Sequence, residues 1–146
     1  RGLRDVYKRQ VMHMLGLMYY RHRTREFVDE NVIGRINKAK VIMREGIYDN
    51  LSAKDVADRL HTGYSGFRKA FKEFTGTSPA QYMQELKLNE AKRLLTTTSR
   101  PIKEISFSLK YDNPEYFSIF FKRRTSMTPV EYRLLARRGK VDPSQE

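Results

Sequence analysis

The sequence predicts an all-α fold that contains two helix-turn-helix modules, and three observations support this prediction. Residues 71–82 and 121–132 are near-copies of each other, and a repeat of about fifty residues indicates one supersecondary structure used twice. In both copies, a helix end is followed by a short turn and by the capped start of a new helix. No segment alternates apolar and polar residues as a strand does. We therefore expect seven helices, arranged as two homeodomain-like three-helix units joined by a long linker helix.

The first three helices are predicted from apolar residues at helical spacing and from residues that begin or end helices. We expect the first helix at residues 32–45, followed by Gly46 at a position where helices commonly end. A capping box at residues 52–55 begins the second helix, and Gly63 can cap the third helix, at residues 64–74. The side chains expected to face the core are Val32, Ile36, Ala39, Met43, Ala53, Val56, Ala57, Leu60, Phe67, Ala70, Phe71 and Phe74.

The fourth helix begins at a second capping box, residues 78–81, and we expect it to reach about Leu95 without an internal glycine or proline. The second module then repeats the first, with one residue inserted. Its first helix begins at Ile102, and its second begins at Pro114 after the cap residue Asn113. The side chains expected to face the core of this module are Ile102, Ile105, Leu109, Phe117, Phe120 and Phe121.

A third capping box, at residues 128–131, begins the seventh helix, which we expect to end near Arg138. These boundaries place one tandem helix-turn-helix domain at residues 31–138 and a disordered tail at residues 139–146.

The chain begins with Arg1 rather than methionine, and residues 1–30 are expected to be the remnant and linker of an upstream sensor or dimerisation domain. Residues 11–20 are apolar and rich in methionine. They could be the last helix of such a domain, a dimer contact or a poorly packed remnant. Residues 21–30 are charged, as linkers commonly are. Whether residues 1–10 belong to the natural protein stays open.

The composition narrows the class of function. The net charge is +12, which folding does not require and which indicates nucleic acid or, less often, an anionic membrane as the partner. Cysteine is absent, which excludes disulfides, thiolate zinc sites and cysteine nucleophiles. The three histidines, His13, His22 and His61, lack metal-ligand spacing, and there is no glycine-rich phosphate loop. The longest apolar run is too short to cross a membrane. We therefore expect a cytoplasmic, non-enzymatic protein without metal, cofactor or membrane.

A helix-turn-helix module reads DNA with its second helix, called here the reading helix. Its early residues reach base edges, and basic residues further along bind phosphates. In the first module, the candidates for base contacts are Ser65, Arg68 and Lys69, and Lys72 is the candidate for a phosphate contact. Arginine suits this role because its guanidinium group pairs with guanine through two hydrogen bonds. The alternative is that Arg68 and Lys69 only form a solvated helix face.

The second module offers a different set of side chains. The candidates for base contacts are Glu115, Tyr116 and Ile119, and the candidates for phosphate contacts are Lys122, Arg123 and Arg124. Glu115 can accept a hydrogen bond from cytosine, and Ile119 can touch a thymine methyl group. Alternatively, Glu115 and the basic residues only complement the helix dipole, while Ile119 belongs to the core and Tyr116 is partly packed.

Three segments of the second module have a highly specific spacing: DNPEYFS at 112–118, FKRRT at 121–125 and MTPVEY at 127–132. In these segments the chain resembles the AraC/XylS family of bacterial transcription regulators, and the resemblance covers about residues 36–137. It implies seven helices, major-groove binding by both reading helices, and control of transcription, usually by activation through RNA polymerase.

Three positions depart from the family pattern. The family often has glycine where this chain has Lys110, and usually where it has Ser126. Many members have arginine at the position of Ile119, so the resemblance implies polar readout by the first module more strongly than by the second.

Other functions stay open at this point. The chain could be a nonspecific architectural DNA-binding protein, or a basic module that binds an acidic protein. Some proteins with this fold repair DNA with a cysteine methyl acceptor, but a chain without cysteine cannot perform that chemistry. If the regulator interpretation holds, the partners are double-stranded DNA in the bacterial nucleoid and RNA polymerase. The operator, the regulated genes, the effector of an upstream domain, the sign of regulation and a homodimer through that upstream region stay open.

Overall fold

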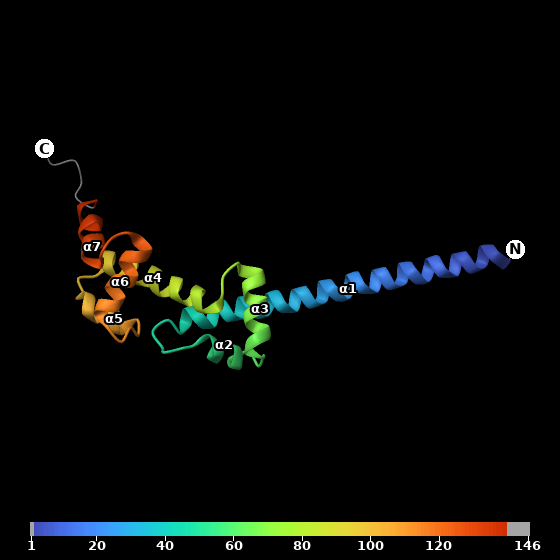
Figure 1. The fold of residues 1–146 in the computed structure, drawn as a ribbon, viewed down its shortest axis with the longest axis horizontal. Helices are drawn as coiled ribbons and strands as arrows, with labels where there is room; N and C mark the ends of the chain where they lie inside the picture. Colours follow the sequence, from blue (N-terminus) through green and yellow to red (C-terminus); the bar gives the residue numbers. More distant parts are fainter. Residues whose placement is uncertain (1, 140–146) are drawn as a thin grey trace. The chain divides into compact units, whose positions relative to one another are not determined.

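The computed structural model describes the backbone of residues 2–139 and the side chains of residues 7–8, 10–19 and 31–139. This part of the chain contains seven helices and no strand (Figure 1). The helices are α1 (Gly2–Glu45), α2 (Ala53–Arg59), α3 (Tyr64–Thr75), α4 (Pro79–Thr97), α5 (Ile102–Ser108), α6 (Pro114–Thr125) and α7 (Pro129–Arg138). The predicted all-α fold is therefore confirmed. Of the predicted tail, residues 140–146 lie outside the described residues.

The first helix is much longer than the one predicted at residues 32–45. α1 has 44 residues, and its backbone is helical through residues 21–30, where we expected a linker. It contains no proline, and its internal glycines, Gly16 and Gly34, each cost only about 1 kcal/mol, so no local signal stops it. For residues 11–20 the sequence left a helix as one of several alternatives, and residues 11–19 show no clear apolar face because their large apolar side chains, which are 53–72% exposed, occur on most sides of the helix.

The chain divides into two compact units, residues 1–38 and residues 39–146. The second unit contains both helix-turn-helix modules: α2 with α3 is the first module, and α5 with α6 is the second module. α3 and α6 are the two reading helices.

The two modules have the same internal packing. Phe71 of α3 lies edge-on to Tyr82, and Phe121 of α6 lies edge-on to Tyr132, with ring centroids 5.4 Å apart in both pairs. Four residues after each of these phenylalanines, a threonine hydroxyl donates to the phenylalanine carbonyl oxygen, at 2.7 Å in α3 and 2.8 Å in α6. The repeat in the sequence is therefore a repeat in three dimensions.

The helices begin where the sequence predicts because their caps are local. All three predicted capping boxes are present, at the starts of α2, α4 and α7. In each box, the serine or threonine oxygen accepts from the backbone N–H three residues later, and that residue's side chain accepts from the N–H of the cap residue. Each box thus pairs N–H groups that the first turn of a helix leaves unpaired.

Most of the predicted core residues are buried. They are Ile36, Ala39, Met43, Ala53, Val56, Ala57, Phe67, Phe71, Ile105, Leu109, Phe117 and Phe121. All the other predicted core residues except Phe74 are half-buried, namely Val32, Leu60, Ala70, Ile102 and Phe120. Phe74 was assigned to the core wrongly, since it is 42% exposed in the last turn of α3. Its counterpart in the repeat is Arg124, a residue type that usually lies at the surface. Comparison of the two copies would have indicated exposure at this position, whereas apolar periodicity alone did not.

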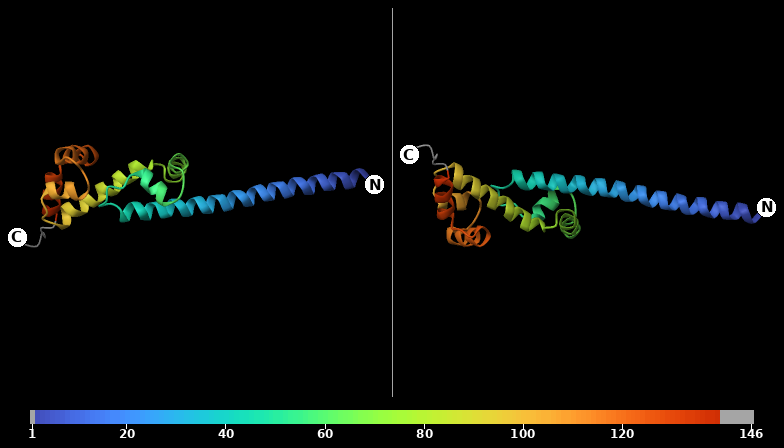
Figure 2. Two further views of the ribbon diagram at one scale, coloured as in Figure 1. Left: turned by 90° about the horizontal axis from the view of Figure 1, so that it is seen from below. Right: turned by 90° about the horizontal axis from the view of Figure 1, so that it is seen from above.

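α4 joins the two modules, because it contacts α2 and α3 as well as α5 and α7. Its buried residues Leu88, Ala91, Leu94 and Leu95 belong to one apolar core with α5 and α6. Arg133 of α7 holds the end of α4 by donating to the carbonyl oxygen of Leu95 at 3.2 Å. Figure 2 shows that α3 and α6 lie on the same side of α4.

Candidate nucleic-acid interface

The outer face of α3 carries all four residues predicted to contact DNA in the first module. Ser65, Arg68, Lys69 and Lys72 are exposed, whereas Phe67, on the opposite face of the helix, is buried. The first turn of α3 contains no acidic residue, so its partial positive charge is not offset by a local carboxylate. This face can therefore approach an anionic surface such as the DNA backbone.

The outer face of α6 also carries its predicted residues, but its centre is apolar. Ile119 is 58% exposed, so the alternative in which it belongs to the core is wrong. Tyr116 is 62% exposed, and one side of it is packed, because its ring lies 6.5 Å from the ring of Tyr111, centroid to centroid. Glu115 is exposed in the first turn, and its backbone N–H donates to the side-chain oxygen of Asn113 at 2.7 Å. Lys122 is exposed further along the helix.

The last two predicted phosphate contacts differ in their surroundings. Arg123 is exposed, whereas Arg124 forms an ion pair with Glu85 of α4. The side chains of this pair are 48% and 39% exposed, and solvent-exposed pairs contribute only about 0–1 kcal/mol. Arg124 can therefore exchange Glu85 for a phosphate at small cost. The sequence did not reveal this pairing, because the two residues lie in different helices.

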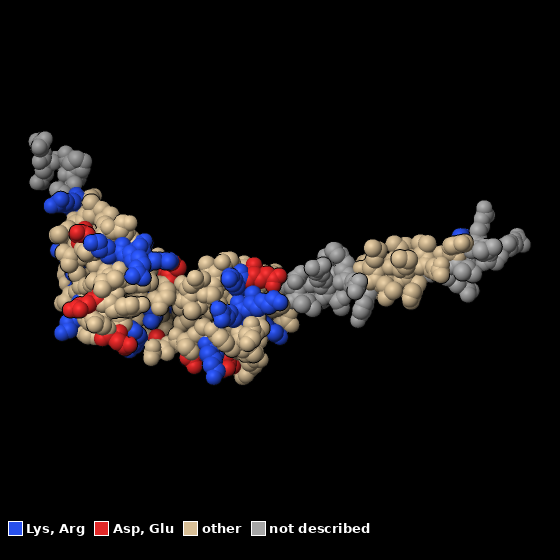
Figure 3. All heavy atoms as spheres, in the orientation of Figure 1, with Lys and Arg blue, Asp and Glu red and all other residues tan. Residues whose placement is uncertain are grey.

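Basic side chains gather over both modules on one face of the residue 39–146 unit. Figure 3 shows one group of Lys and Arg side chains over α3 and another over the region of α6 and α7. Acidic side chains are also present on this face, mainly beside these groups. A chain with a net charge of +12 that concentrates its cations in this way is suited to a polyanion.

The turn of each module contains a residue with left-handed backbone. The φ angle is 51° at His61 in the first module and 62° at Lys110 in the second. Ser126, after α6, also has a positive φ of 65°, like Gly76 after α3 at 80°. The positions at which the family often has glycine are therefore positions where the backbone favours glycine. This chain accommodates a side chain at both of these positions, Lys110 and Ser126.

Tyr111, which follows Lys110, anchors the second turn to α4. It is 7% exposed, its hydroxyl donates to Gln84 Oε1 at 3.2 Å, and the Lys87 ammonium lies 5.4 Å from its ring centroid. Burial raises the pKa of Tyr111 to about 12 and lowers the pKa of Lys87. Tyr111 therefore remains a neutral donor at ordinary pH and positions the start of α6. Sequence reasoning missed it, although an aromatic residue inside an otherwise polar turn was an available signal.

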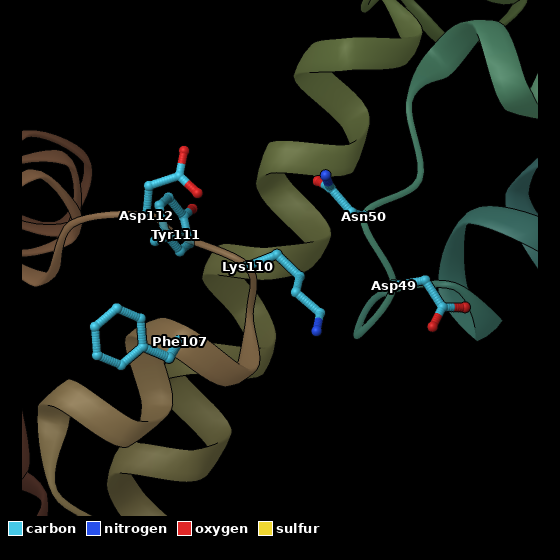
Figure 4. A pocket seen from close by; sticks show the side chains of 6 residues that line it. All are labelled: Asp49, Asn50, Phe107, Lys110, Tyr111 and Asp112. Atoms are coloured by element: carbon cyan, nitrogen blue, oxygen red, sulfur yellow. The ribbon is translucent and has the colours of Figure 1, made fainter.

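A cleft of about 430 Å³ lies between the loop after α1 and the turn before α6. Figure 4 shows Lys110 extending from this turn towards the loop that carries Asp49 and Asn50. Asp112 also lines the cleft, so its lining includes two carboxylates and one lysine. This balance of charge does not suit a phosphate, and the cleft is not part of the candidate DNA surface.

In the described part of the chain, no group of three or more histidine, cysteine or acidic side chains could hold a metal ion. None of its helices combines the length and the hydropathy that a membrane span requires.

Comparison with known proteins agrees with this geometry. The profile of a family described as "Helix-turn-helix domain" matches residues 56–134, more than half of the chain. The chain is 30% identical over 96 residues to the uncharacterized HTH-type transcriptional regulator YisR of Bacillus subtilis, and this match covers 66% of the chain and 33% of YisR. It is 27% identical over 131 residues to the HTH-type transcriptional activator RhaS of Escherichia fergusonii, covering 90% of the chain and 47% of RhaS. The chain thus spans less than half the length of these relatives.

Two solved structures share this fold. A transcriptional regulator with an AraC-type DNA-binding domain from Chromobacterium violaceum superposes with a TM-score of 0.68 at 28% identity, covering 73% of this chain and 96% of that one. The DNA-binding domain of AdpA, solved in complex with a target DNA, has the same fold, with a TM-score of 0.68 at 21% identity and coverage of 72% of this chain and 95% of that one. The chain therefore belongs to the AraC/XylS family and carries its tandem helix-turn-helix DNA-binding domain.

Proposed function

We propose that this domain is the sequence-specific DNA-binding part of a bacterial transcription regulator, and that α3 and α6 enter two successive segments of the major groove. One observation carries the proposal: the same module occurs twice, and both reading helices lie on the same side of α4 (Figure 2). Two reading helices on one side of a connecting helix can meet one face of a duplex, where successive major-groove segments recur about every 10 base pairs.

The proposed roles of the side chains follow from their places on the reading helices. Base contacts are made by Ser65, Arg68 and Lys69 of α3 and by residues on the outer face of α6. Phosphate contacts are made by exposed cations later in each helix, namely Lys72, Lys122 and Arg123, with Arg124 joining them when it leaves Glu85. Phosphate contacts fix the orientation of the protein on DNA, and base contacts provide the sequence preference.

The test is a selection from random duplexes at a fixed salt concentration, followed by titration of the selected and scrambled sequences. We expect two short conserved boxes separated by about one helical turn. The selected duplex should bind at least about 10³-fold more tightly than the scrambled one. Equal affinity for both would instead indicate a nonspecific architectural protein. Absence of binding at low salt would indicate a module for an acidic protein partner.

We further propose that the regulator is an activator that acts through RNA polymerase at the bacterial nucleoid in the cytoplasm, with the protein itself supplying no catalysis. The support is that several related proteins, RhaS among them, are described as transcriptional activators. A promoter that carries the selected operator, transcribed in vitro with purified RNA polymerase, tests this proposal. Increased transcript on addition of the protein supports activation, whereas decreased transcript would make the protein a repressor.

A further inference from the structure

The outer face of α6 is apolar at its centre, which distinguishes it from the outer face of α3. Tyr116 and Ile119 are three residues apart and are therefore neighbours on one side of the helix. They are 62% and 58% exposed, whereas Phe117 and Phe121, which face the core, are 1% and 0% exposed. Single exposed apolar residues are common on proteins. An exposed apolar pair at the centre of a face that would meet DNA instead calls for an apolar group on the DNA.

Two of the three polar residues that α3 offers to bases, Arg68 and Lys69, lack an exposed polar counterpart on α6. In the repeat, Arg68 corresponds to Ser118, and Lys69 corresponds to Ile119. Ser118 is half-buried, and its hydroxyl donates to the carbonyl oxygen of Pro114 at 3.0 Å. Its proton is therefore already used within its own helix. Readout by α6 cannot repeat the chemistry that α3 offers.

Tyr116 is supported from behind, and cations follow the apolar pair along α6. The ring of Tyr116 lies 6.5 Å from the ring of Tyr111, centroid to centroid, and Tyr111 is itself bonded to α4. Lys122 and Arg123 are exposed in the following turns, where they can bind phosphates. A DNA backbone bound by these cations would bring base edges, rather than water, against Tyr116 and Ile119.

Among the groups that base pairs present in the major groove, the apolar one is the C5 methyl group of thymine. We propose that α6 recognises thymine, with Ile119 and the ring of Tyr116 packed against thymine methyl groups in the box that α6 occupies. This inference rests on the proposed function, because it requires α6 to lie in the major groove. It makes Ile119 a specificity-determining residue in a chain whose first module reads bases with polar side chains.

The experiment replaces each thymine of the selected operator, one at a time, by deoxyuridine. Deoxyuridine keeps every hydrogen-bonding group of thymine and lacks only the methyl. The box that α6 occupies is identified beforehand by DNA cleavage from an iron chelate on Leu134→Cys, since the chain has no other cysteine and Leu134 of α7 is 50% exposed. We expect affinity to fall about fourfold for each contacted methyl, the effect of losing one buried carbon group.

The variant Ile119→Ala should bind two duplexes with equal affinity when they differ only in thymine or deoxyuridine at the position that Ile119 contacts. The matched control is Val130→Ala, which shortens a 52% exposed apolar residue of α7 and should retain the full difference. Ile119→Lys, which installs the residue found at the equivalent position of α3, should also abolish the difference while keeping overall affinity.

The outcomes separate the inference from the function on which it rests. Specific binding with no loss at any deoxyuridine in the box of α6 would overturn thymine recognition and leave the regulator function intact. An Ile119→Ala variant that keeps the full difference, or a selected box without thymine, would overturn it as well. Failure to select any operator would overturn the proposed function itself.

Discussion

The two reading helices end in the same backbone conformation. Gly76 after α3 and Ser126 after α6 occupy equivalent positions in the repeat, and both have left-handed backbone, with φ of 80° and 65°. Each donates its backbone N–H to the carbonyl oxygen of the lysine four residues earlier, at 2.9 Å and 2.8 Å. The two sites therefore differ mainly in whether a side chain is present. We expect Ser126→Gly to stabilise the protein and Gly76→Ser to destabilise it.

The magnitude follows from the backbone alone. A β-carbon added at Gly76 would meet no atom within 4 Å, so Gly76→Ser introduces no clash with neighbouring residues. Left-handed backbone costs an L-residue about 1–2 kcal/mol. Against this, the side chain restricts the unfolded chain, which recovers about 0.4–1 kcal/mol. The net change in the free energy of unfolding should be about 1 kcal/mol, with opposite signs at the two sites.

The assay is urea unfolding followed by circular dichroism, with thermal unfolding as a second measurement. A change of about 1 kcal/mol should move the midpoint of thermal unfolding by about 2–4 °C in a chain of this size. Gly66→Ser is the matched control. Gly66 also has no neighbour within 4 Å of an added β-carbon, but its φ is not positive and it lies inside α3. There, serine should stabilise, because glycine is the poorer helix former.

The reasoning would be refuted if Gly66→Ser and Gly76→Ser changed stability in the same direction. It would also fail if Ser126→Gly lowered the stability, because some interaction of the serine side chain would then outweigh the backbone effect. Confirmation would mean that this chain tolerates a strained residue at a position where its family usually has glycine.

Arg68→Ala should cost about 1–3 kcal/mol of specific binding and relax the preference at one base pair; titration against a library of single-base variants checks this, and a uniform loss would make Arg68 a phosphate contact. Ser106→Ala should stabilise the second module by about 1 kcal/mol in urea unfolding, because the buried Ser106 hydroxyl has no hydrogen-bond partner. The reverse change at the equivalent position of the first module, Ala57→Ser, should destabilise the protein. A loss of stability in Ser106→Ala would show that the hydroxyl has a hydrogen-bond partner after all. Insertion of half a helical turn, roughly 5 base pairs, between the two boxes of the operator should abolish most specific affinity. A full-turn insertion should not restore the affinity, because α4 cannot stretch. Unchanged affinity in a gel-shift titration would mean that only one module reads DNA. The backbone N–H of Thr128, and then its hydroxyl, holds the pKa of Glu131 below its ordinary value of 4.5. The stabilisation from this cap is therefore present above about pH 4.5 and is lost as the pH falls through the lower folded-state pKa. Glu131→Gln, which copies Gln81 of the equivalent box, should keep the cap and show a weaker acid dependence in urea unfolding, and an unchanged acid dependence would contradict this.

Local features of the sequence were sufficient to place six of the seven helices. A capping box depends only on residues three positions apart, and proline at a first helical position acts within one turn. The observed starts of α2, α4, α6 and α7 therefore match the predicted ones. The repeat added what local patterns cannot supply, because two copies of one pattern indicate a duplicated module. The exposure of all ten proposed DNA-contacting side chains agrees with their assignment to outer helix faces, while their roles towards DNA stay predictions.

The features that the sequence did not determine are those set by contacts between distant residues or by missing stop signals. The length of α1 went unrecognised because residues 11–19 have apolar side chains on most sides, and so show no clear face, and because the charge of residues 21–30 is typical of a linker. The exposure of Phe74 depends on where the core of the first module ends, and the pairing of Arg124 with Glu85 depends on how α6 lies against α4. The burial of Tyr111 is of the same kind. The sequence by itself determined the helix starts and the duplicated module, because those signals act over a few residues. Only the tertiary structure decided which exposed faces are apolar, which cations are already paired and what anchors the second turn, because helices that are far apart in the chain meet only after folding.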